Sequence, residues 1–335
     1  MSRIFVTGGT GFLGRHLIDQ LLQGDHEVVA LIRRDPSPSL PDGVTLRRGD
    51  VTDEASIADA AAGCERAYHC AGLVSRDEAD AEAMYRVHVD GTKVTLDALK
   101  KAGVKRVVVA STSGTVAISE DPDEIRDEEG EAPLGILSRW PYYRSKLFAE
   151  QVALERNDEG FEVIAVLPSL LLGPGDIHGS STDDVRKFIE RKIPFSPAGG
   201  IAFVDARDAA RALILAMEKG EPGRRYLVNA ANMPLRVFFG RLERITGVKA
   251  PPMSMPRTPP RLAGIGAELI GKLAERLNMP SPLDRISAEM AQYYWYCDAS
   301  RAEQELGWEP RDPGETLLDT VDDLRARGVV WPALG

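Results

Sequence analysis

Tyr142 and Lys146 are the two side chains whose types and spacing most directly suggest chemistry in this sequence. They stand four residues apart, so they share one face if the segment is helical. A nearby ammonium group and a helix N-terminus both favour a phenolate, which predicts that the pKa of Tyr142 lies below its usual value of about 10. A tyrosine of this kind can donate a proton to an alcohol oxygen or accept one from it. The pair therefore predicts an acid–base site.

Three adjacent hydroxyl groups, on Ser111, Thr112 and Ser113, follow a β-branched run at positions 106–110. A hydroxyl at the end of a strand can hydrogen-bond a reacting carbonyl group and orient it. The chemistry of the side chains does not choose among the three. A junction between a strand and a loop is also often rich in hydroxyls without any catalytic role.

A glycine-rich turn near the start of the chain predicts a nucleotide site. Its spacing is Gly-x-x-Gly-x-x-Gly, between a predicted strand and a predicted helix. The first glycine allows a tight turn, the second lets the backbone approach a pyrophosphate, and the third lets helix and strand pack closely. Free amides at the helix N-terminus then favour the phosphates. The residues expected to contact the cofactor here are Gly8, Thr10, Gly11, Phe12, Leu13 and Gly14.

The end of the second predicted strand indicates which nicotinamide nucleotide is bound. NAD sites usually carry an acidic residue about 20 residues after the glycine-rich turn, where it binds a ribose hydroxyl. This chain carries Arg33 and Arg34 there, and a guanidinium can bind the 2′-phosphate of NADP(H) through two hydrogen bonds. NAD(H) stays open as the alternative, because the arginines could be solvated and Asp35 follows them. Asp50, after the third strand, is placed to hydrogen-bond the adenine.

The elements that position these residues alternate between short β-branched runs and longer amphipathic stretches. Such alternation predicts an α/β fold with a doubly wound parallel sheet of the Rossmann type. After position 168 the pattern loosens, and we expect a smaller, mainly helical C-terminal lobe that binds the substrate. We expect the Rossmann domain to comprise 1–167 with 201–229, and the interleaved lobe to comprise 168–200 with 230–335. The expected strands are 4–7, 27–32, 44–47, 67–70, 106–110, 163–167, 203–205 and 226–228, and the expected helices include 12–23, 54–62, 82–102, 142–156, 183–192 and 206–219.

Composition and charge restrict the class of protein. The chain has 335 residues, 43% hydrophobic and 27% charged, as is ordinary for a globular protein. Its formal net charge of −10 argues against nucleic acid as a partner, because phosphate backbones require a basic surface. The three cysteines lack the spacing of metal ligands, so we expect reduced thiols, no metal site and a cytoplasmic protein. We expect no signal peptide and no membrane span, because the apolar runs are too short.

These motifs resemble those of the extended short-chain dehydrogenases/reductases, and most of all the branch of dihydroflavonol 4-reductases, 3β-hydroxysteroid dehydrogenases and hopanoid-associated sugar epimerase-like proteins. The resemblance covers nearly the whole chain and is carried by segments 6–14, 90–92, 142–146 and 298–307. It implies that Thr112 is the catalytic hydroxyl, where the family usually has serine, and that Lys146 also binds the nicotinamide ribose. It also implies a homodimer formed through the two long helices. The remaining cofactor contacts that we expect are Val51, Ala71, Gly72, Tyr142, Lys146 and Pro168.

One departure from the family concerns His88. Many relatives have asparagine before a Val-x-Gly-Thr element, whereas this chain has His88 before the segment 89–92. We expect His88 to be structural rather than catalytic. We assign no chemistry to His69, at the end of the fourth predicted strand.

Two classes of enzyme share this machinery. Reductases pass a hydride from NADPH to a ketone or aldehyde. Nucleotide-sugar epimerases and dehydratases hold NAD(P) tightly, oxidise the sugar transiently and return the hydride. The second class commonly carries asparagine in an Asn-Val-Tyr-Gly-Pro element, and Leu170 stands at that position here, which favours a reductase. A non-catalytic NADP-binding sensor is a third hypothesis, but such relatives typically lose the tyrosine or the lysine.

The C-terminal lobe carries an apolar stripe at near-helical spacing. It either walls a pocket for an apolar substrate or packs in the core of the lobe. Together with Leu170, it leads us to expect an NADPH-dependent oxidoreductase acting on the CH–OH group or carbonyl of a small apolar molecule. The residues of the stripe are Leu262, Ile265, Leu269, Ile270 and Leu273.

Overall fold

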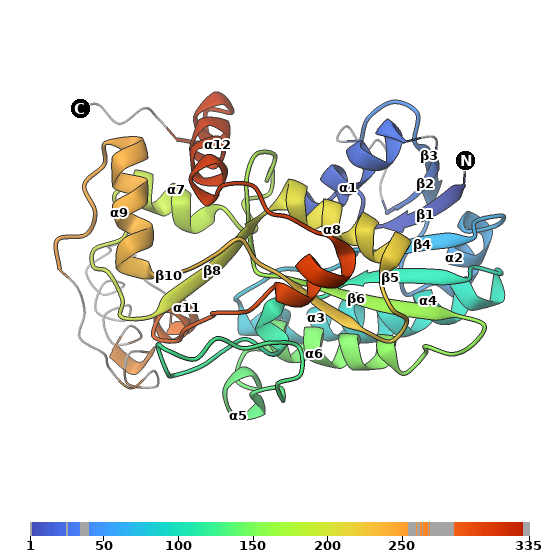
Figure 1. Cartoon of the computed structure of the whole chain (residues 1–335), viewed down its shortest axis with the longest axis horizontal. Helices are drawn as coiled ribbons and strands as arrows, with labels where there is room; N and C mark the ends of the chain where they lie inside the picture. Colours follow the sequence, from blue (N-terminus) through green and yellow to red (C-terminus); the bar gives the residue numbers. More distant parts are fainter. Residues whose placement is uncertain are drawn as a thin grey trace.

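A seven-stranded parallel sheet forms the larger part of the molecule (Figure 1). The computed structural model describes residues 2–24, 26–33, 40–253, 259, 262, 264–266, 268 and 285–330. The strand order is β3-β2-β1-β4-β5-β6-β9, which confirms the predicted doubly wound Rossmann sheet. Its strands are β1 (Arg3–Thr7), β2 (Glu27–Ile32), β3 (Thr45–Arg48), β4 (Arg66–His69), β5 (Arg106–Ala110), β6 (Glu162–Pro168) and β9 (Arg225–Val228).

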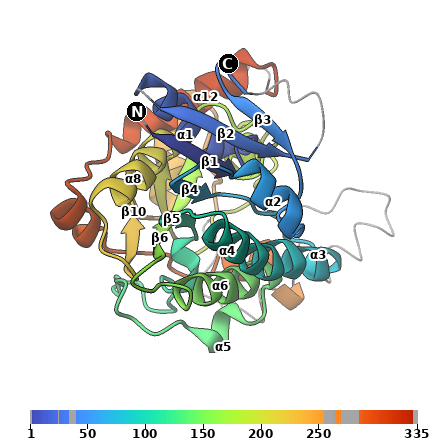
Figure 2. The same cartoon turned by 90° about the vertical axis from the view of Figure 1, so that its right-hand side faces the viewer.

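Helices cover both faces of this sheet (Figure 2). One face carries α1 (Phe12–Gln23) and α8 (Ala206–Lys219), and the other carries α2 (Glu54–Ala60), α4 (Gly91–Lys101) and α6 (Pro141–Leu154). Neighbouring strand residues point to opposite faces, so Val6 packs in the core with α1 and α8 while Phe5 packs with α2 and α4. Because both faces are buried, the strands other than the exposed edge strand β3 are apolar almost throughout, which is why the sequence reveals them.

The long helix predicted over 82–102 contains an irregular turn. It consists of α3 (Ala81–Tyr85), a π-helical segment (Arg86–Asp90) and α4. A π-helical turn contains an extra residue and changes the direction of the side chains around it. In this segment His88 and Val89 are buried.

A second, three-stranded sheet lies in the smaller lobe, in the order β10-β8-β7. Its strands are β7 (Leu170–Leu172), β8 (Gly200–Asp205) and β10 (Ala231–Pro234). The prediction that 203–205 is one of the last Rossmann strands is therefore wrong, because β8 pairs with β7 and β10. A buried apolar strand has the same composition in either sheet, so its own residues do not identify its partners.

The remaining elements that the structure describes in the lobe are helices, as predicted. The sheet shares a core with α7 (Asp183–Ile189), α9 (Leu235–Thr246) and α12 (Pro313–Ala326). A further helix, α11 (Arg285–Met290), packs through Ile286 and Met290 near the start of α6. In the described ranges, no helix is long and apolar enough to cross a bilayer. Of the apolar stripe, Leu262 and Ile265 are exposed, and Leu269, Ile270 and Leu273 lie outside the described residues.

Candidate active site

The carboxyl ends of four neighbouring strands bring the predicted site residues to one edge of the main sheet. Gly8 follows β1, Ala71 lies just beyond β4, Thr112 lies just beyond β5, and Pro168 ends β6. The strand order reverses between β1 and β4. In open α/β sheets, ligands bind outside the carboxyl ends at such a reversal, so the position fits the predicted cofactor site.

The glycine-rich turn has a shape that only glycines permit. Gly8 has a φ of +72°, and a Cβ atom there would lie 2.4 Å from the carbonyl carbon of Cys70. A Cβ atom on Gly14 would lie 2.2 Å from the carbonyl oxygen of Gly8. The Gly11 amide donates to the Gly8 carbonyl at 3.0 Å, and Gly11 is the N-cap of α1. This turn, with glycines at its closest backbone contacts and at a helix N-terminus, fits a pyrophosphate.

Arg33 and Asp50 lie close together at the carboxyl ends of β2 and β3. Arg33 is exposed, and the Asp50 carboxylate accepts hydrogen bonds from the Thr52 amide at 2.9 Å and the Thr52 hydroxyl at 2.7 Å. Burial acts to raise the pKa of Asp50, but the Thr52 hydrogen bonds and the charges of Arg33 and Arg86 hold that pKa below its usual value. A positive charge therefore stands where the sequence expects the adenosine ribose.

Tyr142 and Lys146 lie in the first two turns of α6, and both are partly buried. The Lys146 ammonium donates a hydrogen bond to the carbonyl oxygen of Ala110 at 2.6 Å, and burial lowers its pKa to about 8. The Tyr142 ring meets the rings of His88 and Tyr143 edge to face, at centroid distances of 5.7 and 5.0 Å. Burial raises the pKa of Tyr142, and Tyr143 adds to that effect. The predicted lowering of this pKa is therefore wrong, because burial and Tyr143 both raise it.

The structure distinguishes the three hydroxyls that the sequence leaves open. The Ser111 hydroxyl donates to the Glu150 carboxylate at 2.5 Å. Ser113 is buried and hydrogen-bonds the Cys297 thiol. The Thr112 oxygen accepts a hydrogen bond from the Gly114 amide at 3.3 Å, and no described residue accepts the Thr112 hydroxyl proton. Of the three, Thr112 is therefore the candidate whose hydroxyl proton is not used within the described part of the chain.

Comparison with known proteins identifies the family. A model of the NAD dependent epimerase/dehydratase family matches residues 4–229, which is more than half of the chain. The chain belongs to this family. It is therefore a nicotinamide-dependent enzyme of the oxidoreductase and epimerase kind, which agrees with the glycine turn and with the resemblance noted from the sequence.

Individual relatives within the family are similar over almost their full length. The chain is 32% identical to a putative dihydroflavonol 4-reductase of Synechocystis sp., over 97% of this chain and 95% of that protein. It is 32% identical to sterol demethylase protein B of Methylococcus capsulatus, over 97% of this chain and 99% of that protein. The solved structure of gox2253 has a TM-score of 0.83 and 25% identity, over 99% of this chain and all of that one.

Glu150 is a residue of this candidate site that the sequence analysis did not predict. Its carboxylate, 2% exposed, accepts hydrogen bonds from Ser111, from the Thr115 hydroxyl at 3.0 Å and from Arg225 at 3.3 Å. It thereby fixes the loop that carries Thr112 against α6. The available signal was spacing, because Glu150 continues the four-residue interval that begins with Tyr142 and Lys146 on one helix face.

Two buried histidines lie beside the catalytic candidates. His69 hydrogen-bonds the hydroxyls of Thr7 at 2.8 Å and Thr92 at 3.0 Å through its two ring nitrogens. Burial, together with the charge of Lys146, lowers the pKa of both His69 and His88 to about 3. Both rings are therefore neutral near pH 7, and neither stores a proton for catalysis.

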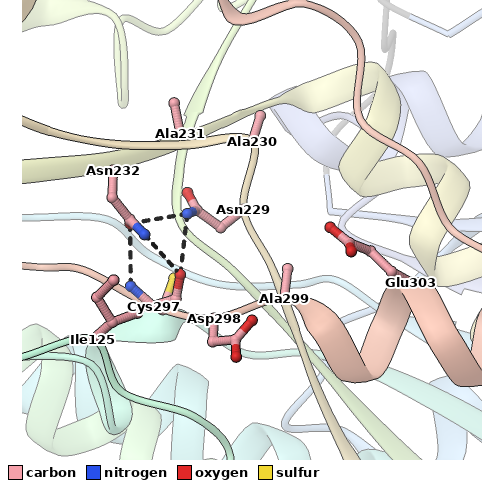
Figure 3. A pocket seen from close by; sticks show the side chains of 9 residues that line it. All are labelled: Ile125, Asn229, Ala230, Ala231, Asn232, Cys297, Asp298, Ala299 and Glu303. Atoms are coloured by element: carbon pink, nitrogen blue, oxygen red, sulfur yellow. Dashed lines mark hydrogen bonds between the residues drawn. The ribbon is translucent and has the colours of Figure 1, made fainter.

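Two cavities, each of about 440 Å³, lie in the lobe and along its border with the main sheet. In the first, the amides of Asn229 and Asn232 bond to each other and to the backbone of Cys297, so their polar groups are already paired (Figure 3). The second lies at the start of α6, two residues before Tyr142. It is lined by Glu78, Arg139, Trp140, Ile265, Arg285, Ile286 and Glu289. Among the described residues, no cluster could hold a metal ion.

Proposed function

We propose that this protein is an NADPH-dependent oxidoreductase that reduces a ketone or aldehyde group of a small, largely apolar molecule, or oxidises the corresponding alcohol. The observation that carries the proposal is the position of Tyr142, Lys146 and Thr112 along the same edge of the sheet as the glycine turn. The phenol of Tyr142, the ammonium of Lys146 and the hydroxyl of Thr112 thus lie beside the turn that is expected to bind the nucleotide.

Each of the three side chains has a separate role in this proposal. A bound nicotinamide supplies the hydride. Tyr142 gives the proton to the carbonyl oxygen, and its raised pKa keeps the phenol protonated near neutral pH. The Thr112 hydroxyl donates a hydrogen bond to the same oxygen and orients it. Lys146 binds the ribose hydroxyls, and its ammonium favours the negative charge that develops on the phenol oxygen.

Arg33 supports the choice of NADPH, and its substitution tests that choice. The wild-type protein is expected to bind NADPH more tightly than NADH, and Arg33→Ala is expected to remove most of that preference. A hydrogen bond to a charged group contributes about 1.5–3 kcal/mol, so NADPH affinity should fall by about 12- to 140-fold. Fluorescence titration with both nucleotides measures this. The control is Arg244→Ala, an exposed arginine on α9. Equal affinities in the wild type would contradict the NADP(H) assignment.

Leu170 favours a largely apolar substrate, because it removes the amide that would contact a nucleotide-sugar diphosphate. The second cavity offers apolar surface on Trp140, Ile265 and Ile286, beside two arginines and two glutamates whose charges balance. Relatives of this chain are named as reductases, among them the putative dihydroflavonol 4-reductase.

A substrate screen separates this proposal from the other activity found in the family. NADPH consumption is measured spectroscopically with a panel of apolar ketones and aldehydes, and product formation is measured with a panel of nucleotide sugars. We expect NADPH to be consumed with members of the first panel and no conversion in the second. Conversion of a nucleotide sugar without net loss of NADPH would favour an epimerase and overturn the proposal.

A further inference from the structure

His88 connects two parts of the site that are far apart in the sequence. It lies in the π-helical segment and is 2% exposed. The main-chain amide of Leu73 donates a hydrogen bond to its Nε2 atom at 3.0 Å. Its Nδ1 atom lies 2.8 Å from the hydroxyl oxygen of Ser145, and this hydroxyl donates to the carbonyl oxygen of Tyr142 at 2.9 Å. A single imidazole ring thus joins the loop after β4 to the first turn of α6.

The hydrogen bond from the Leu73 amide determines the tautomer of this ring. An amide N–H can only donate, so Nε2 must be unprotonated, and a neutral imidazole then carries its proton on Nδ1. The Nδ1–H group donates to Ser145, which leaves the serine hydroxyl proton for the Tyr142 carbonyl. Burial and the charge of Lys146 lower the pKa of His88 to about 3, which keeps the ring in this neutral form.

The two ends of this hydrogen-bonded connection lie beside the two groups that react in the proposed mechanism. One end is the loop expected to contact the cofactor, and the other is Tyr142. Leu73 directly follows Ala71 and Gly72, the pair expected to contact the cofactor. Gly72 packs against the imidazole so closely that a Cβ atom on it would lie 3.3 Å from Nε2. At the other end, the edge-to-face contact between the rings of His88 and Tyr142 adds to the link through Ser145.

We propose that His88 is a positioning residue that sets the distance between a bound nicotinamide ring and the Tyr142 phenol. Its Nε2 atom holds the cofactor-side loop, and its Nδ1 atom holds Tyr142 through Ser145. This inference rests on the proposed function, because it needs Tyr142 as the proton donor. The two nitrogens make separable contributions, since each serves one partner.

Two substitutions separate these contributions. The side-chain amide of His88→Asn ends near the Nδ1 position, so it can still donate to Ser145 but not accept from Leu73. The amide of His88→Gln ends near the Nε2 position, so it can accept from Leu73 but not reach Ser145. One hydrogen bond contributes about 0.5–1.5 kcal/mol, which corresponds to about 2- to 12-fold in an equilibrium or rate constant.

We therefore expect the two variants to lose different properties, one mainly kcat and the other mainly NADPH affinity. His88→Gln should show the lower kcat, and His88→Asn the weaker NADPH binding. The kcat values are measured with a ketone identified by the screen, and the dissociation constants by fluorescence titration. Equal losses in both variants, in proportion to lost thermal stability, would show a merely structural role and overturn the inference.

The tautomer of His88 provides a test that needs neither a variant nor a substrate. Nitrogen-15 NMR of the wild-type protein is expected to show His88 protonated at Nδ1 and unprotonated at Nε2. A ring protonated at Nε2 would overturn the inference even if the variants failed to fold. Failure of the proposed function has a different signature, because the screen would then show no NADPH consumption with ketones or aldehydes, or Tyr142→Phe would retain its turnover, whatever the tautomer of His88.

Discussion

Tyr142→Phe is expected to lower kcat by about 10²- to 10⁴-fold, the usual contribution of a positioned acid or base, while NADPH affinity stays near that of the wild type. The substitution removes only the hydroxyl, and the ring contacts with His88 and Tyr143 can persist. Steady-state kinetics with a ketone from the screen gives kcat, and fluorescence titration gives the dissociation constant of NADPH.

Two further tyrosines serve as controls for this substitution. Tyr85→Phe removes an exposed hydroxyl from α3 and is expected to leave kcat unchanged. Tyr143 is the more demanding comparison, because its ring lies beside that of Tyr142 and packs on Trp295 at 5.0 Å. If Tyr143→Phe lost turnover and Tyr142→Phe retained it, Tyr143 would be the acid and the assignment of Tyr142 would be wrong.

The nucleotide-binding half of the fold is predictable from the sequence because local patterns determine it. Apart from the exposed edge strand β3, the strands are short, buried on both faces and mostly rich in β-branched residues, so their positions follow from composition. The glycine turn is predictable for a related reason, since a positive φ and close backbone contacts exclude other residues. A functional role that depends on one short segment can therefore be predicted from the sequence alone.

Features that depend on contacts between distant segments are not predictable in this way. The pKa of Tyr142 depends on burial and on Tyr143, which the spacing to Lys146 does not reveal. The choice of Thr112 among three hydroxyls depends on Glu150 and Cys297, which occupy its neighbours. In the same way, β8 belongs to the small sheet because of its partners rather than its own residues. The sequence supplies the candidate groups, and tertiary contacts determine which of them are free to react.

Gly8→Ala is expected to abolish the stabilisation of the protein by NADPH and to destabilise the apoprotein as well. A non-glycine residue in a left-handed conformation costs about 1–2 kcal/mol. At Gly8 the new Cβ atom would also lie 2.4 Å from the carbonyl carbon of Cys70 and 2.5 Å from the Ala71 amide nitrogen. Both contacts are with backbone, so the turn itself must move, at a cost of about 1–3 kcal/mol more.

A matched glycine separates these two costs. Gly247, at the end of α9, has a φ of +74°, almost the +72° of Gly8, but a Cβ atom there would have no atom within 4 Å. Gly247→Ala should therefore show only the conformational cost in urea denaturation and should keep the rise in melting temperature caused by NADPH. Gly8→Ala should show the larger loss of unfolding free energy and no such rise. Similar behaviour of the two variants would mean that the close packing of Gly8 against the end of β4 does not shape the nucleotide site.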